Sequence, residues 1–357
     1  MLDVKEAAGE AINLLKELIS ITSYSREEDK TANLLENFLK KQGLDVHRSL
    51  NNVWVETAGS SENKPVILLN SHHDTVKPNT AYTRDPFSPD VVDGKLYGLG
   101  SNDAGGPLVS LLFTFLILSK KEQPYKLIFA ATAEEEVSGK NGIAALLPEL
   151  GKIDLGVVGE PTLCQMAVAE KGLMVLDCVA RGKAGHAARE EGINSIYEAL
   201  PDIEWFRTYK FPKVSPTLGK VKTSVTQIEA GTQHNVVPDA CKFVVDVRST
   251  EQYSNQEIYE IIQQHVKCEV NPRSFRLNSS GIAETHPIVK KGFELGLEAY
   301  GSPTLSDQAL MPFTTIKVGP GDSARSHTAD EFIFTDEIEQ GIRTYINLLD
   351  QLDLGAV

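Results

Sequence analysis

The chain has 357 residues, which is enough to bury one large hydrophobic core and a second, smaller one. Hydrophobic residues make up 41% of it and charged residues 24%, as in folded globular proteins and unlike disordered or fibrous chains. The 49 acidic residues outnumber the 35 basic ones, and the net charge of -14 repels nucleic-acid phosphates and anionic membrane surfaces. We therefore expect two structural units, and neither nucleic acid nor a membrane as a partner.

The cysteines and the first residues of the chain bear on where the protein works. The four cysteines have no C-x-x-C spacing and stand mostly in apolar or strand-like runs, so we expect reduced, buried thiols. Residues 1–20 carry charges throughout and contain no long apolar stretch, which argues against a secretory signal or a membrane span. These features predict a cytoplasmic protein.

The first part of the chain alternates helical and strand-like patterns. Apolar residues recur at helical spacing over residues 14–19, and Ser25 with Glu28 predicts a capping box for a second helix that ends near Gly43. The apolar stretch 108–121 is long enough for a core helix and short for a membrane span. This order predicts an α/β fold in which a mixed sheet lies between layers of helices. Buried strands are expected at the short apolar runs 66–69, 127–130, 155–158 and 316–318.

The pattern changes between residues 173 and 270. Strand-like and helical runs follow one another there in the order β-α-β-β-α-β, which is typical of a small ferredoxin-like α+β domain. A further strand and His327 come after this stretch, so we expect the chain to return to the first domain. The predicted organisation is one domain of residues 1–168 and 281–357, with residues 169–280 inserted as a second domain.

The first candidate site follows the strand-like run 66–69 directly. Open α/β sheets place their sites at the carboxyl ends of strands, and His72 and Asp74 stand in that position. In such an H-x-D pair the histidine can bind a metal through neutral imidazole, while the aspartate accepts its other N–H. An exposed loop that contains His and Asp by chance is the alternative.

A single carboxylate, Asp103, stands among glycines and small residues in the stretch 97–107. Small residues let the backbone pass close to a bound ion, so Asp103 could bridge two metal ions. The glycines also resemble a dinucleotide-binding loop that begins at Gly98, but Asp103 occupies the place of the third glycine of G-x-G-x-x-G. This argues against an oxidoreductase, and a tight turn without function is the remaining alternative.

Three further segments present acidic residues or histidine after predicted strands. Glu134, Glu135 and Glu136 are adjacent, and the repulsion among their carboxylates is most simply offset by a cation. Glu160 follows the next strand and His327 the last one. A solvated acidic loop and a surface histidine are the alternatives for single segments. Taken together, the imidazoles and carboxylates suit zinc better than magnesium or a thiolate-bound metal.

These motifs resemble the zinc aminoacylase and metallopeptidase family that includes acetylornithine deacetylase, succinyl-diaminopimelate desuccinylase and glutamate carboxypeptidase. The match covers essentially the whole chain in one order: His-x-Asp, Gly-x-Gly-x-x-Asp, Glu-Glu, Glu-Pro-Thr and a late histidine followed closely by acidic residues. The resemblance implies that Asp103 bridges two zinc ions. His72 and Glu160 would complete one metal site, and Glu136 and His327 the other. Co²⁺ or Mn²⁺ could replace Zn²⁺ on the same ligands.

The resemblance also implies roles for residues that bind no metal. Glu135 would be the general base of the catalytic domain. The inserted domain would be a lid and the dimerisation module of a homodimer, and its His186 would stabilise an oxyanion across the dimer. Asn235 and Arg248 would contact the substrate, Arg248 by binding a carboxylate. A salt bridge within the lid is the alternative for Arg248, and a purely structural role is the alternative for His186.

Some positions depart from the family pattern. Family members often have aspartate where this chain has Glu134, and lysine where it has Gly105. Neither change removes a ligand. His73 is an extra histidine inside the His-x-Asp triplet, and the spacing to Asp74 selects His72 as the ligand. We therefore expect His73 to be a structural histidine.

The resemblance implies a hydrolase that cleaves the amide bond of a small-molecule N-acylated amino acid. The segment 319–331 is closer to the deacetylase branch, so we expect N-acetylornithine, an intermediate of arginine biosynthesis, to be converted to acetate and the free amine. Succinyl-diaminopimelate, N-succinyl or N-acetyl citrulline and short peptides are the alternatives within the family. A non-catalytic metal-binding protein on the same fold is the alternative outside it, and such a protein would usually lack Glu135 or a ligand.

Overall fold

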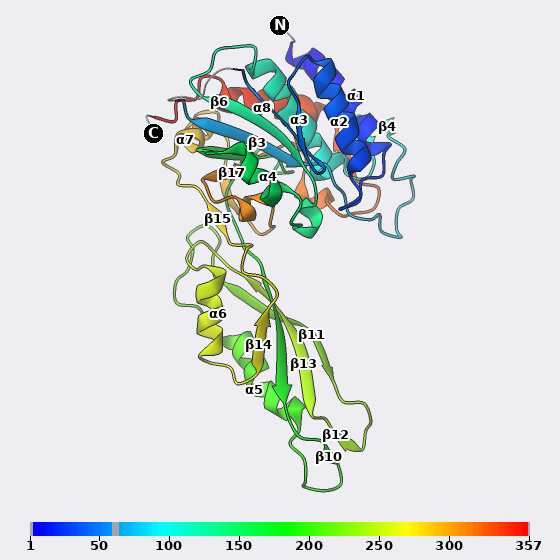
Figure 1. The fold of residues 1–357 in the computed structure, drawn as a ribbon, viewed down its shortest axis with the longest axis vertical. Coiled ribbons are helices and arrows are strands. Elements are labelled where there is room, and N and C mark those ends of the chain that lie inside the picture. The colour runs from blue at the N-terminus through cyan, green and yellow to red at the C-terminus, as the bar shows by residue number, and fades with distance from the viewer. Residues whose placement is uncertain (1–2, 59–63, 356–357) are drawn as a thin grey trace. The chain divides into compact units, whose positions relative to one another are not determined.

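A computed structural model describes residues 3–58 and 64–355 and divides the chain into two compact units (Figure 1). Unit 1 contains the residues up to Val168, the segment Gly281–Tyr300 and the residues from Ser306 onward. Unit 2 contains Ala169–Ser280 and the short segment Gly301–Leu305. Each unit has a hydrophobic core of its own. The role of unit 2 as a lid and dimerisation module stays a prediction.

A mixed sheet forms the centre of unit 1. Its strands lie in the order β1-β2-β6-β3-β7-β17-β8. β3 pairs in parallel with β6 on one side and β7 on the other, and β17 continues the parallel set beside β7. β2 and β8 are antiparallel neighbours of this set. The strands span His47–Ser49 (β1), Asn52–Glu56 (β2), Val66–His72 (β3), Lys126–Thr132 (β6), Leu155–Val158 (β7), Met166–Glu170 (β8) and Thr315–Lys317 (β17).

Side chains alternate along the central strands and enter two separate layers. In β3, Ile67 and Leu69 belong to the larger core cluster, whereas Val66 and Leu68 belong to a second cluster on the opposite face. The larger cluster contains residues of α1, α2, α3, α7 and α8, and the second contains residues of α4. The sheet therefore lies between helices, which confirms the predicted fold class. The helices span Val4–Ile19 (α1), Asp29–Lys41 (α2), Gly106–Leu118 (α3), Ile143–Leu150 (α4), Pro287–Glu294 (α7) and Thr335–Leu349 (α8).

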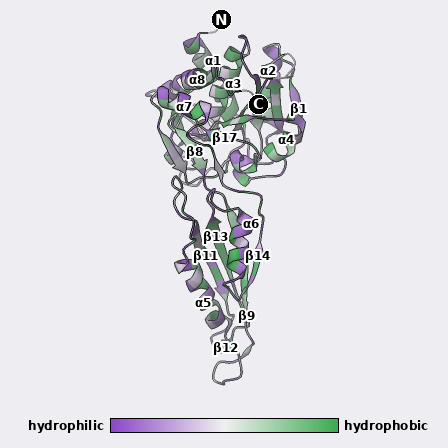
Figure 2. Ribbon diagram, turned by 90° about the vertical axis from the view of Figure 1, so that its left-hand side faces the viewer, coloured by the Kyte–Doolittle hydropathy of each residue, from purple (hydrophilic) through white to green (hydrophobic). Residues whose placement is uncertain are grey.

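Unit 2 has the expected ferredoxin-like arrangement. Its antiparallel sheet has the strand order β11-β13-β9-β14. Helices α5 and α6 mix hydrophobic and hydrophilic residues (Figure 2), and buried residues such as Phe206 of α5 and Ile258 of α6 join the core of this unit. The elements are Met174–Arg181 (β9), Ser195–Thr208 (α5), Lys222–Ala230 (β11), Ala240–Arg248 (β13), Asn255–Gln263 (α6) and Glu269–Pro272 (β14).

Short strands complete the fold, and one set of them bears on the site. β18 pairs with β5, and β5 pairs with β4, so the segment after His327 lies against the segment before Asp103. In unit 2, β10 pairs with β12. The short strands are Val91–Val92 (β4), Lys95–Tyr97 (β5), Gly185–His186 (β10), Val236–Val237 (β12), Ser280–Gly281 (β15), Ala299–Ser302 (β16) and Phe332–Phe334 (β18).

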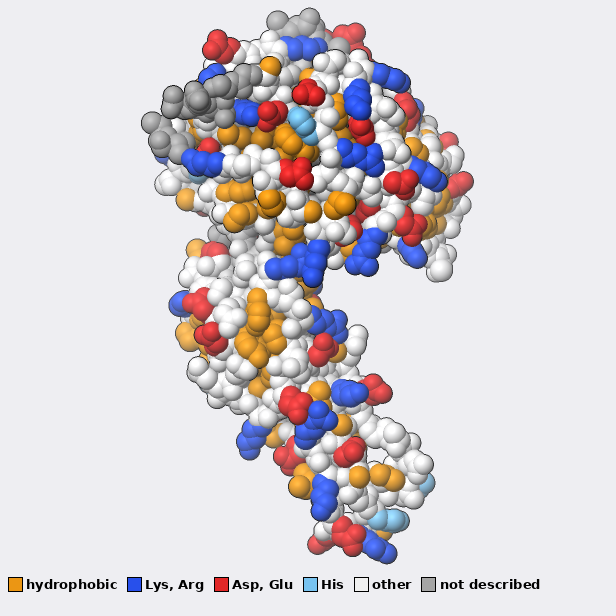
Figure 3. All heavy atoms as spheres, in the orientation of Figure 1, with side chains coloured by type: hydrophobic (Ala, Val, Ile, Leu, Met, Phe, Trp, Pro, Cys, Tyr) orange, Lys and Arg blue, Asp and Glu red, His pale blue; other side chains and the backbone are white. Residues whose placement is uncertain are grey.

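Figure 3 shows the charged residues on one face of each unit. On the face shown in Figure 3, acidic and basic side chains are interspersed over both units. This pattern differs from the continuous basic surface with which nucleic-acid-binding proteins approach phosphates.

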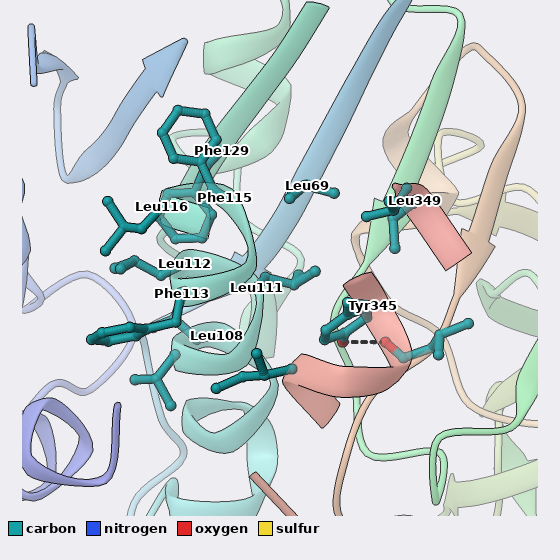
Figure 4. Close-up of a cluster of buried hydrophobic side chains, with 14 of the residues drawn as sticks. Leu69, Leu108, Leu111, Leu112, Phe113, Phe115, Leu116, Phe129, Tyr345 and Leu349 are labelled. Carbon is teal, nitrogen blue, oxygen red and sulfur yellow. Dashed lines mark hydrogen bonds between the residues drawn. The ribbon is translucent and has the colours of Figure 1, made fainter. Parts of the chain in front are cut away.

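Helix α3 is the apolar centre of unit 1 (Figure 4). All of its residues are buried, and its Phe115 lies 6.4 Å from Phe129 of β6, measured between ring centroids. By length and composition the segment Ser101–Leu118 could cross a membrane, but 89% of it is buried inside the protein, as a core helix is. Beside α3, the Tyr345 hydroxyl of α8 donates to the carbonyl oxygen of Val318 at 2.5 Å. This bond fixes the backbone just beyond β17.

The prediction of a capping box at the start of α2 is wrong. The helix begins at Asp29, and Glu28 occupies the N-cap position without a side-chain capping bond. The Ser25 hydroxyl instead donates to Asp74 Oδ2 at 2.7 Å, and Glu28 Oε1 accepts the backbone N–H of Glu134 at 3.2 Å. Both side chains therefore bind the loops that follow β3 and β6, and those partners are distant in the sequence.

Candidate metal centre

Four neighbouring parallel strands end at one edge of the sheet in unit 1, and each delivers a candidate residue. β3 ends with His72 itself, and the helical turn Glu135–Val137 follows β6. Glu160 comes shortly after β7, and His327 follows β17 through the turn Ser323–Arg325. Because parallel strands run in the same direction, their carboxyl ends meet at the same edge. The fold thus brings together residues that are far apart in the sequence.

Asp103 approaches the same residues from the turn that precedes α3. The turn spans Ser101–Gly105, and Gly100 before it has a φ of 74°, which other residues rarely adopt. A Cβ at Gly105 would lie 2.4 Å from the carbonyl oxygen of Gly100. The lysine that family members often have at this position would therefore require the turn to shift. The two glycines permit the compact turn that carries Asp103.

Two groups of three side chains have the arrangement of metal ligands, and they share Asp103. In the first group, His72 Nε2 lies 3.3 Å from Asp103 Oδ1 and 3.8 Å from Glu160 Oε1. In the second, His327 Nε2 lies 2.9 Å from Glu136 Oε2 and 3.7 Å from Asp103 Oδ2. The donor atoms within each group lie within 4.8 Å of one another. Asp103 thus offers one oxygen to each group, as a bridging carboxylate does.

The ionisable groups around His72 perturb one another strongly. Burial alone would lower the pKa of His72, but hydrogen bonds to Asp103 and Asp74 and the charges of Glu135 and Glu160 raise it well above its ordinary value. Burial raises the pKa of Glu160 to about 8, and the negative charge of Asp103 adds to this effect. Glu160 therefore retains its proton near neutral pH, mainly because it is buried and in addition because the Asp103 carboxylate repels its negative charge.

The second group shows the same coupling. The hydrogen bond to Glu136 raises the pKa of His327 to about 9, and burial with the charge of Asp103 raises the pKa of Glu136. A metal ligand must be deprotonated, so a bound cation and these protons are alternative ways to offset the same repulsion. The two imidazoles and the carboxylate oxygens fit a metal of the zinc type.

Glu135 lies beside the first group and belongs to neither. Its Oε2 is 3.9 Å from His72 Nε2, and its side chain is 12% exposed. Burial raises the pKa of Glu135 well above its ordinary value, and the charges of Glu160, Asp307 and Glu136 add to the effect while His72 opposes it. A carboxyl whose pKa is moved toward neutrality can both accept and donate a proton near neutral pH.

Asp74 has more partners than the sequence predicts. His72 Nδ1 lies 3.0 Å from the backbone carbonyl oxygen of Asp74 and 3.5 Å from its carboxylate Oδ1. Because a carbonyl only accepts, Nδ1 carries the proton in the neutral ring and Nε2 faces the candidate ligand group. The carboxylate accepts the backbone N–H groups of Glu135 at 3.0 Å and Glu136 at 3.2 Å. Asp74 therefore holds the turn that carries these two residues.

His73 is satisfied inside the protein. Its Nδ1 lies 2.9 Å from Thr31 Oγ1, and its Nε2 lies 2.9 Å from the carbonyl oxygen of Asn51. Burial lowers the pKa of His73 to about 4, so the ring is neutral. Both ring nitrogens are thus engaged away from the two ligand groups, as expected of a structural histidine.

Glu331 is a buried acid without an expected role. Its Oε1 accepts the backbone N–H groups of Asn102 at 2.8 Å and Asp103 at 2.9 Å, and its Oε2 accepts that of Gly100 at 3.0 Å. Burial and the charge of Asp103 raise the pKa of Glu331 to about 8. The acidic residues that closely follow His327 are the only signal for it in the sequence.

Asp307 is a second buried acid without an expected role. Its Oδ2 accepts from Asn70 Nδ2 at 2.9 Å and from Thr132 Oγ1 at 2.8 Å. These two bonds connect the carboxyl-terminal ends of β3 and β6. Burial raises the pKa of Asp307 to about 6. It follows no apolar strand in the sequence, so the pattern that locates the other acids does not locate this one.

Two of the candidates in unit 2 lie together. His186 belongs to β10, which pairs with β12, and Asn235 directly precedes β12. The backbone carbonyl oxygen of Asn235 accepts the N–H of Ala187 at 2.9 Å. The N–H of Ala188 donates to His186 Nδ1 at 3.1 Å, so Nε2 carries the proton in the neutral ring. His186 is exposed and can present this N–H to a ligand.

Arg248, the third candidate in unit 2, has an acidic partner. It donates from Nε to Asp246 Oδ1 at 2.9 Å and from a terminal nitrogen to Asp246 Oδ2 at 3.1 Å. The salt bridge within unit 2, which was the alternative role of Arg248, is therefore present between Arg248 and Asp246. A substrate carboxylate would have to displace Asp246 from the guanidinium group.

Comparisons with known proteins agree with this geometry. A family model described as "Peptidase family M20/M25/M40" matches residues 68–351. A [LysW]-lysine/[LysW]-ornithine hydrolase of Sulfurisphaera tokodaii is 29% identical, over 96% of this chain and 95% of the relative. An acetylornithine deacetylase of Proteus mirabilis is 25% identical, over 90% of this chain and 91% of the relative.

Solved structures with the same fold include peptidases. Aminopeptidase PepT from Bacillus cereus superposes with a TM-score of 0.78 at 19% identity, covering 97% of this chain and 98% of that one. A dinuclear metal-binding M20 peptidase from Bacillus subtilis has a TM-score of 0.76 at 18% identity, covering 99% and 100%. The expected family is confirmed: the chain belongs to peptidase family M20/M25/M40 and is a metal-dependent amidohydrolase or peptidase.

Proposed function

We propose that this chain hydrolyses the amide bond of an N-acylated amino acid, with N-acetylornithine as the first candidate substrate. The observation that carries the proposal is the position of Glu135, a largely buried carboxyl that lies beside His72 and outside both ligand groups. A protein that only stores metal ions needs the ligands but has no use for such a group. The products would be acetate and ornithine, and the reaction would belong to arginine biosynthesis.

The names of two relatives support ornithine as the amine that is released. Both the [LysW]-lysine/[LysW]-ornithine hydrolase and the acetylornithine deacetylase have ornithine in their names. They differ on the acyl side, which is LysW in one name and acetyl in the other. The 29% identity to the first makes [LysW]-ornithine or [LysW]-lysine the second candidate. A succinyl-diaminopimelate desuccinylase at 25% identity supports a succinylated amino acid as a further alternative, alongside N-acyl citrulline and short peptides.

Zinc is the metal that we propose for both ligand groups. His72 and Glu160 would hold one ion, Glu136 and His327 the other, and Asp103 would bridge them, with Co²⁺ or Mn²⁺ able to take the same places. When bound, the ions would polarise the substrate carbonyl and lower the pKa of a water molecule.

Glu135 would move the proton that amide hydrolysis requires. It would accept a proton from the attacking water and return it to the nitrogen of the leaving amine, so the carboxylate is regenerated in each cycle. Its raised pKa makes it a stronger base than an exposed glutamate. Asp74 would keep this base in place because its carboxylate binds the backbone N–H groups of Glu135 and Glu136.

Unit 2 would supply the remaining contacts to the substrate. The chain would form a homodimer through this unit. His186 would then donate a hydrogen bond from Nε2 to the developing oxyanion in the active site of the partner chain. Asn235 would bind the substrate by its amide. Arg248 would bind the substrate carboxylate once Asp246 is displaced.

The state of the cysteines supports the proposed cytoplasmic location. Cys164, Cys178, Cys241 and Cys268 are all free, and the first three are buried. Burial raises the pKa of Cys164 to about 11, which keeps that thiol protonated and unreactive. Free thiols persist in reducing compartments.

Replacement of Glu135 by Gln removes the base and leaves both ligand groups intact. We expect kcat to fall by about 10²–10⁴-fold, the range that general acid–base catalysis contributes, while zinc content measured by mass spectrometry stays at the wild-type level. The matched control is Glu136→Gln, which alters the neighbouring carboxyl and should lose zinc as well as turnover. If Glu135→Gln keeps kcat within about tenfold of the wild type, another group is the base.

A substrate panel separates the candidate reactions. Zinc-loaded protein is incubated with N-acetylornithine, succinyl-diaminopimelate, N-acetylcitrulline, a dipeptide and [LysW]-ornithine, and amine release is followed by mass spectrometry. We expect the highest kcat/KM with N-acetylornithine. A higher value with [LysW]-ornithine would make that conjugate the substrate. Binding of these compounds without cleavage of any would indicate a non-catalytic protein.

Replacement of His186 by Ala removes an imidazole N–H donor that belongs to neither ligand group. We expect kcat to fall by about 10²–10³-fold with full zinc content, as for loss of one oxyanion donor. A dimer that combines a His186→Ala chain with a Glu135→Gln chain has one intact site if the histidine acts across the dimer. Recovery of activity on mixing the two inactive variants is the expected result, and no recovery would place His186 in the site of its own chain.

A further inference from the structure

We propose that Glu331 is a positioning residue of the metal centre, which fixes Asp103 for binding two ions by holding the backbone of its turn. The inference rests on the proposed two-metal function and concerns a residue that binds neither metal. It follows from two observations: the bonds that Glu331 makes and its place four residues after His327.

The Glu331 carboxylate binds three N–H groups of one short turn. It accepts from Gly100 at 3.0 Å, from Asn102 at 2.8 Å and from Asp103 itself at 2.9 Å, and the residue is 2% exposed. Backbone N–H groups of one turn that converge in this way form a small anion-binding concavity. The direction of the Asp103 backbone is therefore set by a side chain from the far end of the chain.

The same residue connects this turn to the loop of the second histidine. The backbone carbonyl of Glu331 accepts the N–H of Gly98 at 3.0 Å. On the other side of His327, Asn102 Nδ2 donates to the carbonyl oxygen of Asp322 at 3.0 Å, and the N–H of Asp322 donates to Asn102 Oδ1 at 3.0 Å. The loop that carries His327 is thus fixed to the turn of Asp103 at both of its ends. Asp103 and His327 both belong to the second ligand group.

The three N–H groups need three acceptor sites on one side chain. The two carboxylate oxygens of Glu331 provide them, because Oε1 accepts two of the N–H groups and Oε2 accepts the third. A neutral amide could not accept from all three N–H groups, because one of its two terminal atoms is a donor.

The test compares zinc affinity in Glu331→Gln and in a matched control, Asp330→Asn. The control also replaces a carboxylate by an amide, in the adjacent residue. Asp330 accepts the N–H groups of Thr83 and Arg84 and does not bind the Asp103 turn. Zinc affinity and stoichiometry are measured by competition with a chromophoric chelator, without substrate. The melting temperature of each metal-free protein is measured in parallel.

We expect Glu331→Gln to bind zinc about 10–100-fold more weakly than the wild type, the range found when a residue that orients a ligand is changed. Asp330→Asn should bind zinc as the wild type does. A residue that served only the stability of the fold would lower the melting temperature of the metal-free protein and leave the zinc affinity of the folded protein unchanged. That result would overturn the inference.

A second variant keeps the test decisive if Glu331→Gln does not fold. Glu331→Asp keeps the charge but is shorter by one methylene, so it cannot reach all three N–H groups, and we expect an intermediate loss of zinc affinity. Wild-type affinity in Glu331→Asp would also contradict the inference. A wild-type protein that binds no zinc contradicts the proposed two-zinc function itself, which separates the failure of that function from the failure of this inference.

Discussion

The candidate metal centre in unit 1 depends on one constraint. Its carboxylates meet at one edge of a sheet and repel one another. Two unit charges about 4 Å apart interact by roughly 4 kcal/mol at an effective dielectric constant of about 20. Asp103, Glu136 and Glu160 crowd two imidazoles at such separations, with Glu135 beside them. Burial and the charge of Asp103 raise the pKa of Glu160, and the hydrogen bond to Glu136 raises the pKa of His327, so bound protons offset negative charge at this edge. Bound cations relieve the repulsion directly, so the charge distribution and the proposed chemistry have the same origin.

The fold withstands this repulsion because the side chains are delivered by rigid elements. Four parallel strands fix the positions of the residues at their carboxyl ends, and the fully buried helix α3 supports the turn before it. Two further carboxylates, Asp74 and Glu331, bind the backbone N–H groups of the two turns that present Glu135 and Asp103. Acidic side chains at this edge thus have two kinds of role: some face the ligand groups, and others hold the backbone beneath them.

Much of this arrangement could be predicted from the sequence because its signals are local. The apolar runs before His72, Glu135 and Glu160 are strands in the structure, and the residues after them meet because parallel strands share a direction. The ferredoxin-like order of unit 2 follows from the same kind of pattern. The split of the chain into domains and the individual site roles remain proposals.

The features that escaped prediction depend on distant contacts. Ser25 resembles a helix cap in the sequence, but a buried carboxylate elsewhere in the fold is its partner. Glu331 and Asp307 look like ordinary surface acids until the chain folds around them. The strands β5 and β18 are only three residues long, yet their pairing brings the segment after His327 to the segment before Asp103. Hydrogen bonds between segments that are distant in the sequence determine the positions of these residues.

The most direct test of the central claim is anomalous X-ray scattering at the zinc absorption edge from crystals of the zinc-loaded protein. We expect two anomalous peaks per chain, one beside His72 and Glu160 and one beside Glu136 and His327, with Asp103 between them. A single peak, or peaks remote from these five residues, would contradict that claim.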